Sequence, residues 1–186
     1  KLLLEHGAKE SINIQNNEKK TPLSNAIHHD NLDMLKLLLA NGADPNINLG
    51  VPFDDMTPLY WACENNNLEM VKLLLDNGAK KSINIAHRSK GETPLLWACI
   101  HGNIEMVKLL LDKGAGDSIN LQKIFDTPLF IACKYNNLEM VKLLLQHGAR
   151  KSINLQSNYS TWTPLTVAMN SKHDDSTKIL ELLLKY

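Results

Sequence analysis

The residues of this 186-residue chain that could do chemistry include three cysteines, placed with a regular period. Cys63, Cys99 and Cys133 each follow an alanine and recur at intervals of 36 and 34 residues. Thiolates act as nucleophiles and metal ligands, but a small apolar residue recurring at one position is typical of tight packing between stacked helices. We therefore expect buried, reduced thiols that react slowly and form no disulfide.

The seven histidines follow none of the spacings of zinc sites, and no glycine-rich loop has the spacing of a phosphate- or dinucleotide-binding motif. His28 and His29 stand between two expected helices, where polar turn residues are usual. No serine or cysteine lies in a nucleophile-elbow motif. The sequence thus predicts no catalytic, cofactor or metal site, and a protein that is not an enzyme.

Charge and hydropathy set further expectations. Twenty Lys and Arg balance twenty Asp and Glu without a basic block, so we expect no nucleic-acid partner. The longest apolar runs have three to four residues, far fewer than the roughly 20 of a membrane helix, so we expect no membrane insertion. The odd number of cysteines favours a reducing, cytoplasmic setting, and we expect a monomer.

Three motifs repeat in step along the chain. Thr-Pro-Leu occurs at residues 21, 57, 93, 127 and 163, and an Asn-Leu-Glu-Met-Val-Lys-Leu-Leu-Leu motif or a close variant begins ten residues after each of the first four. Gly-Ala lies at residues 7, 42, 78, 114 and 148. A period of 34 to 36 residues indicates a solenoid of stacked units.

Each motif has a physical meaning within the unit. Thr at an N-cap followed by Pro starts a short helix, because Thr accepts a bond from an orphan amide and Pro has no amide hydrogen to leave unpaired. Asn67 and its equivalents cap a second helix, whose leucines and valine form one apolar face. Gly78 can adopt the left-handed conformation that ends this helix. The residues between Gly-Ala and the next Thr suit an extended, turning arm.

These motifs resemble the ankyrin repeat, and the resemblance covers essentially the whole chain. It implies an all-α ankyrin-repeat solenoid of helix-turn-helix units with projecting β-hairpin loops. We expect one ankyrin repeat domain over residues 1–186, with residues 1–8 ending a truncated repeat and helix pairs starting near 21, 57, 93, 127 and 163. The usual His after Thr-Pro-Leu is absent. Its place is taken by Ser24, Tyr60, Leu96, Phe130 and Thr166.

The resemblance also implies a partner-binding surface on the concave face, formed by the first helices and the arms. The residue before each Thr, such as Glu92 or Asp126, and the variable first-helix positions would face a partner. Aromatic side chains in such a groove are typical binding anchors. Eight residues carried over in this way are the expected partner-binding set: Trp61, Trp97, Tyr135, Trp162, Met56, Ile131, Phe53 and Phe125.

Two functions remain open at this point. The first is a non-catalytic scaffold that binds another protein through these residues. The second is a structural or spacer segment of a larger multidomain protein, in which Trp61 and Trp97 only fill gaps between first helices. An exposed, contiguous apolar surface would favour the first function.

Overall fold

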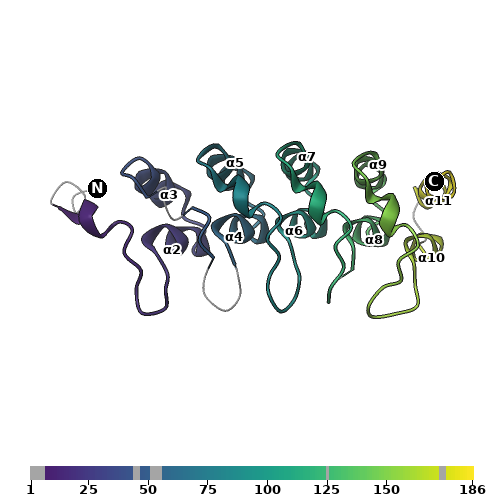
Figure 1. Ribbon diagram of the computed structural model, residues 1–186. Helices are drawn as coiled ribbons and strands as arrows, with labels where there is room; N and C mark the ends of the chain where they lie inside the picture. Colours follow the sequence, from purple (N-terminus) through teal and green to yellow (C-terminus); the bar gives the residue numbers. More distant parts are fainter. Residues whose placement is uncertain (1–6, 44–46, 51–55, 125, 172–174) are drawn as a thin grey trace.

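The chain folds into two rows of helices with loops projecting beyond one row (Figure 1). The computed structural model describes residues 7–43, 47–50, 56–124, 126–171 and 175–186. In Figure 1 the second helix of each pair lies in the upper row and the first helix in the lower row, from which the loops descend. We call the surface formed by the first helices and these loops the first-helix face, and the loops the arms.

Within the described residues there are ten α-helices in five pairs. The first helices are α2 (Pro22–His28), α4 (Pro58–Glu64), α6 (Pro94–Ile100), α8 (Pro128–Lys134) and α10 (Pro164–Met169). The second helices are α3 (Leu32–Leu39), α5 (Leu68–Asp76), α7 (Ile104–Asp112), α9 (Leu138–Gln146) and α11 (Ser176–Leu184). Every first helix begins at the Pro of Thr-Pro-Leu, as the repeat predicts.

The first helices begin as their sequences require. The Thr57 hydroxyl accepts a hydrogen bond from the amide of Tyr60 at 3.2 Å, and the other four threonines cap in the same way. In the first and last pairs a hydroxyl replaces the missing His. Ser24 Oγ accepts from the Thr21 amide and donates to the Thr21 carbonyl, each at 2.9 Å, and Thr166 does the same for Thr163. The central pairs carry large buried side chains there instead.

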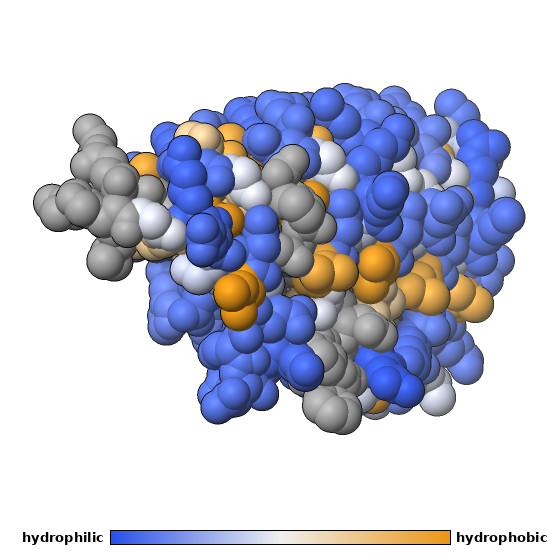
Figure 2. Space-filling model, turned by 60° about the vertical axis from the view of Figure 1, so that its left-hand side comes forward, coloured by the Kyte–Doolittle hydropathy of each residue, from blue (hydrophilic) through white to orange (hydrophobic). Residues whose placement is uncertain are grey.

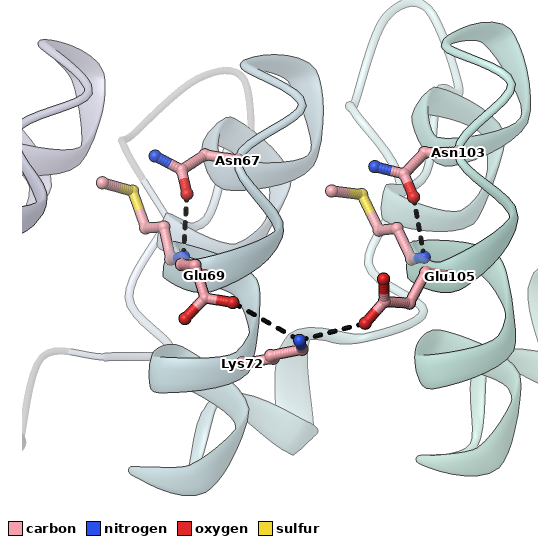
Figure 3. A network of polar contacts seen from close by, with 7 residues as sticks. Asn67, Glu69, Lys72, Asn103 and Glu105 are labelled. Carbon is pink, nitrogen blue, oxygen red and sulfur yellow. Dashed lines mark hydrogen bonds and ion pairs between the residues drawn. The ribbon is translucent and has the colours of Figure 1, made fainter.

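The second helices are joined along their outer surface by repeated polar contacts (Figure 3). Asn67 Oδ1 accepts from the Met70 amide at 2.9 Å, and Asn103 caps α7 in the same way at 3.0 Å. The Lys72 ammonium lies 3.4 Å from Glu69 and 3.1 Å from Glu105 of the next repeat. These pairs are exposed to solvent, so each contributes little to stability.

One continuous core lies between the two rows. Leu59, Leu74, Leu95, Leu110 and Leu129 are fully buried, and so are the alanines of the Gly-Ala motifs that the structure describes from residue 43 onward. Each first helix packs on its own second helix and on the first helices of its neighbours. Each repeat is therefore held mainly by the repeats beside it.

The arms depart from the predicted β-hairpins. At four Gly-Ala motifs a short 3-10 helix begins at the Ala, namely η1 (Ala8–Ser11), η3 (Ala79–Ser82), η4 (Ala115–Ser118) and η5 (Ala149–Ser152). No β-strand occurs among the described residues. The prediction of hairpins is wrong in that sense, because the ends of an arm are closed by isolated bonds and not by a ladder. The His87 amide, for example, donates to the Glu92 carbonyl at 2.7 Å.

A ladder of asparagine side chains joins the bases of successive arms. Asn48 Nδ2 donates to the Gly78 carbonyl of the next repeat at 2.9 Å, and the equivalent bonds of Asn13, Asn84 and Asn120 measure 2.9 to 3.0 Å. These asparagines belong to the Ile-Asn pair that recurs in every arm. In the first four arms the pair therefore has a structural role: its Ile enters the core and its Asn fixes one repeat to the next.

The last three arms also contact one another farther out. The Ile124 amide donates to the Lys90 carbonyl at 3.3 Å, and Asn158 Nδ2 donates to the Lys123 carbonyl at 2.7 Å. Gly91 has a φ of 80°, and a Cβ there would meet Cβ of Lys123 at 2.4 Å. Glycine is thus required at this position, because the neighbouring arm occupies the space of a side chain.

Candidate protein-binding surface

An aromatic cluster occupies the middle of the first-helix face. Trp61 is half-buried and its ring lies edge-on to His28, with centroids 4.6 Å apart. Trp97 is also half-buried and stacks on His101 at 5.8 Å. The Tyr60 ring lies between the two tryptophans, 6.1 and 6.3 Å from their centroids. Both tryptophans thus fill space between neighbouring first helices while part of each ring stays accessible.

Beneath this cluster lies a buried polar contact between two repeats. Tyr60 is 1% exposed, and its hydroxyl donates to Glu92 Oε2 at 2.8 Å. Burial raises the pKa of the Tyr60 hydroxyl above its ordinary value, and the Glu92 charge adds to this effect. Glu92 itself is 2% exposed. The position before Thr was expected to face a partner, but here it faces the interior.

The charged side chains around the cluster lie close enough to shift the pKa of Glu64. Burial raises the pKa of the Glu64 carboxyl, and the negative charge of Glu92 raises it further, while Lys90, His87 and His101 oppose the shift. His101 Nε2 donates to the Glu64 carbonyl at 2.7 Å, which links α6 to the end of α4. These groups serve to join the two repeats.

A pocket of about 640 Å³ opens on the same face near the C-terminal end. It lies between α8, α10 and the arm that precedes α10, and Trp162 and Tyr159 form its aromatic wall. Trp162 is 40% exposed and Tyr159 66%. Phe130 and Val167 form the apolar floor. A pocket of this size with aromatic walls and a polar rim can receive a large side chain of a partner.

Polar groups line the rim of this pocket. Asp126 is 6% exposed, and its Oδ1 accepts from the Asn158 amide at 3.1 Å. The other polar lining residues are Lys134 from α8, Ser157 and Ser160 from the arm, and Asn170 and Ser171 after α10. Ser171 Oγ is buried and has no hydrogen-bond partner among the described residues. A buried hydroxyl of this kind gains stability when a ligand supplies the missing bond.

The structure distributes the predicted partner-binding residues over three environments. Tyr135 is 59% exposed at the end of α8, and Trp162 lines the pocket. Trp61, Trp97 and Met56 are half-buried. Ile131 is 7% exposed and packs in the core, so it offers a partner almost no surface. Phe53 and Phe125 lie outside the described residues.

Of the residues that line the pocket, Asp126 and Val167 stand at positions that were expected to face a partner, although neither is among the eight predicted binding residues, and Phe130 was not expected to face a partner. Phe130 stands at the repeat position of Tyr60 and Leu96, which are both buried, so the sequence gives no sign that it would line a pocket. These residues meet at a pocket because the two adjacent helices and one arm leave space between them.

The three cysteines are buried and free, as predicted. Burial raises the pKa of all three thiols, that of Cys133 to about 12. A thiol in this state is almost entirely protonated at neutral pH and is a weak nucleophile. In the part of the chain that the structure describes, no three His, Cys, Asp or Glu side chains gather where they could hold a metal ion. No helix of that part is long and apolar enough to cross a membrane.

The fold is that of a repeat protein built from stacked helix pairs. A family model described as ankyrin repeats (3 copies) matches residues 47–123 and 116–186, and one described as ankyrin repeats (many copies) matches residues 3–48. The chain belongs to the ankyrin repeat family. Repeats of this family are generally protein-interaction modules and typically lack catalytic activity. No curated protein matches the chain at a significant level.

Proposed function

We propose that this chain is a non-catalytic scaffold that binds another protein through its first-helix face. The pocket beside Trp162 is the observation that carries the proposal. It combines two exposed aromatic side chains with an apolar floor and the buried Ser171 hydroxyl, which has no partner in the part of the chain that the structure describes. Such a combination is typical of a binding hot spot.

The aromatic cluster extends this surface toward the N-terminus. Trp61 and Trp97 each present part of a ring, and Tyr135 lies between them and the pocket in the order of the repeats. Aromatic rings held by their neighbours lose little conformational entropy on binding. The partner would therefore contact the pocket most strongly and the two tryptophans less strongly. The protein acts as a monomer in this proposal.

Substitutions on the first-helix face and on the second helices test the proposal. A partner is first captured from native lysate on the parent chain and identified, and its affinity is then measured by calorimetry. Trp162→Ala should weaken binding by about 2 kcal/mol or more, and Trp61→Ala or Trp97→Ala by a smaller amount. Lys72→Ala and Lys108→Ala, on the second helices, are matched controls and should change it by less than about 0.5 kcal/mol.

Thermal unfolding separates affinity from stability. Trp61→Ala and Trp97→Ala also remove packing, so only variants that keep the parent's unfolding midpoint are compared. If the lysine variants lose affinity and the folded Trp162→Ala variant does not, binding is on the second-helix surface. If no protein is captured specifically, the spacer function replaces the scaffold.

A further inference from the structure

A second apolar surface runs along the arms, outside the aromatic cluster and the pocket. Figure 2 shows a line of hydrophobic residues along one face of the molecule, between two hydrophilic bands. In the sequence, the residue directly after each Ile-Asn pair is aliphatic in every copy. We call these residues the arm row: Ile14, Leu49, Ile85, Leu121 and Leu155.

The arm row is unusually accessible for a periodic aliphatic position. Ile14 is 63% exposed, Leu49 47%, Leu121 39% and Leu155 38%, and Ile85 is half-buried. The aliphatic residue just before each Asn has a different role. Ile47, Ile83 and Ile119 are at most 4% exposed and belong to the core. The apolar side chain of the arm row is therefore not needed to complete the core of its own repeat.

The backbone holds the arm row in place. The amide of Leu121 donates to the Ser118 carbonyl at 3.2 Å, and Ser118 Oγ donates to the Ala115 carbonyl at 2.9 Å. Ile14, Ile85 and Leu155 have the same amide bond. The asparagine before each of the first four residues of the row is fixed to the next repeat. A surface ordered in this way requires little further ordering when it binds.

The charges beside the C-terminal half of the row are mostly positive. Segments 78–92, 114–124 and 148–162 carry seven exposed cationic side chains: Lys80, Lys81, Arg88, Lys90, Lys123, Arg150 and Lys151. Asp117 is the one exposed carboxylate of these segments, because Glu92 is buried. A ligand that follows the row here meets a positive potential, and its own charge should be negative.

The spacing of the row favours an extended ligand. Neighbouring helices pack about 8–10 Å apart, so equivalent side chains of successive repeats recur at a similar distance. A polyproline II segment rises about 3.1 Å per residue with three residues per turn, so every third side chain shares one face at about 9 Å. A β-strand fits less well, because residues i and i+3 point to opposite faces.

We propose that the arm row binds an extended acidic peptide that carries an apolar side chain at every third position. The apolar side chains pack against successive members of the row, and the acidic side chains lie near the flanking lysines and arginines. This site is separate from the pocket and the aromatic cluster, and it stands whether or not those bind a protein.

A synthetic probe tests the proposal. Fluorescein-labelled (Leu-Asp-Pro)5 is titrated with the whole chain, and binding is followed by fluorescence anisotropy. Saturable binding that weakens with added salt is the expected result. Two control peptides should bind far more weakly: one with the same composition in shuffled order, and one with Lys in place of Asp. Equal binding of either control would overturn the proposal.

Single substitutions locate the probe. Leu121→Ser and Leu155→Ser should each weaken binding about 5-fold, because each removes a half-exposed aliphatic contact. Leu184→Ser is the matched control, since Leu184 is 73% exposed but lies on α11, and it should have no effect. Lys81→Glu should weaken binding and reduce its salt dependence, whereas Lys142→Glu on α9 should not. All five positions are exposed, and circular dichroism checks that each variant keeps the fold.

Two other outcomes would contradict the proposal. If Trp162→Ala abolishes probe binding and the row variants do not, the peptide occupies the first-helix pocket and the arm row is not its site. If sedimentation shows that the parent chain self-associates and that Leu121→Ser makes it monomeric, the row is covered by a second copy. If no protein is captured from lysate but the probe still binds the arm row, the scaffold function proposed above is wrong and the arm-row proposal stands.

Discussion

The junctions between the central second helices differ from the junction that joins α9 to α11. Between α5, α7 and α9, Asn residues cap each helix and lysine bridges one helix to the next, with Lys72–Glu105 at 3.1 Å and Lys108–Glu139 at 2.9 Å. In α11 the equivalent glutamate is replaced by Lys178, which pairs with Asp175 of its own repeat at 2.7 Å.

The cap of α11 differs as well. Asp175 makes no side-chain cap bond, whereas Asn67, Asn103 and Asn137 each accept from an amide of the helix they begin. Ser176 Oγ keeps one link by donating to Asn136 Oδ1 at 3.1 Å. The comparison shows that contacts between repeats depend on two consecutive copies carrying the same residues. Where the copies diverge, the lysine pairs within its own repeat and the side-chain cap is lost, and the pocket of the first-helix face lies in the same part of the array.

The largest expected effect comes from equivalent core leucines in the two regions. Leu110 is fully buried in α7 and Leu183 is 4% exposed in α11. Leu110→Ala should lower the free energy of unfolding by about 3 kcal/mol, because the cavity weakens repeats on both sides. Leu183→Ala should lower it by about half as much, because α11 can unfold locally.

Urea unfolding and hydrogen exchange measure this difference. Exchange in Leu183→Ala should speed up within residues 175–184 and remain unchanged in α5 and α7. Equal global destabilisation by both substitutions would show that α11 unfolds together with the central repeats.

Removal of the Tyr60 hydroxyl should have an intermediate effect on the central region. Tyr60→Phe leaves the buried Glu92 carboxyl without the hydroxyl that donates to it, so we expect a loss of about 1–3 kcal/mol at neutral pH. The raised pKa of Tyr60 means that the folded state retains its proton above pH ~10, where the unfolded state loses it. Stability should therefore fall as pH rises above that value.

The pH dependence distinguishes this contact from simple packing. The raised pKa values of the three buried thiols also lower the free energy of unfolding at high pH, but they do so equally in the parent and in Tyr60→Phe. The difference in unfolding free energy between the two should shrink as pH rises above ~10. A difference that stays constant with pH would mean that the hydroxyl is not held in its protonated form by the fold.

The smallest expected effect is a gain of stability at a position in the central region where a hydrogen bond found in other repeats is missing. Asn67 Nδ2 donates to Asp30 and Asn103 Nδ2 to Asn66, each acceptor being a left-handed residue before the second helix. The corresponding residue for Asn137 is Gly102, which has no acceptor side chain and a φ of 68°.

Gly102→Asn should therefore stabilise the protein by about 0.5–1 kcal/mol, by adding a hydrogen bond and restricting the unfolded chain. A Cβ at this position would meet only Asn137 Nδ2, at 3.9 Å. Gly102→Ala is the control, since it has no acceptor and should be neutral or destabilising. A stabilising effect of Ala equal to that of Asn would show that the hydrogen bond contributes nothing.

The repeat period and the helix ends could be determined from the sequence alone. Thr57-Pro58 and Asn67 begin helices by local hydrogen bonding, and Gly78 ends one by its left-handed backbone, so their effects do not depend on distant residues. Burial of Cys63, Cys99 and Cys133 followed in the same way from their common position in each repeat.

The tertiary structure decided which variable residues reach the surface. Glu92 and Ile131 occupy positions that face a partner in the family pattern, yet one is buried against Tyr60 and the other in the core. The pocket beside Trp162 depends on how α8, α10 and one arm pack. The absence of strands among the described arm residues depends on hydrogen bonds within and between arms. Local residue patterns specify helix ends because those contacts lie within a few residues of each other. The exposure of a side chain depends on residues of the next repeat, about 30 positions away in the sequence. The contact between Tyr60 and Glu92, for example, joins residues that are 32 positions apart.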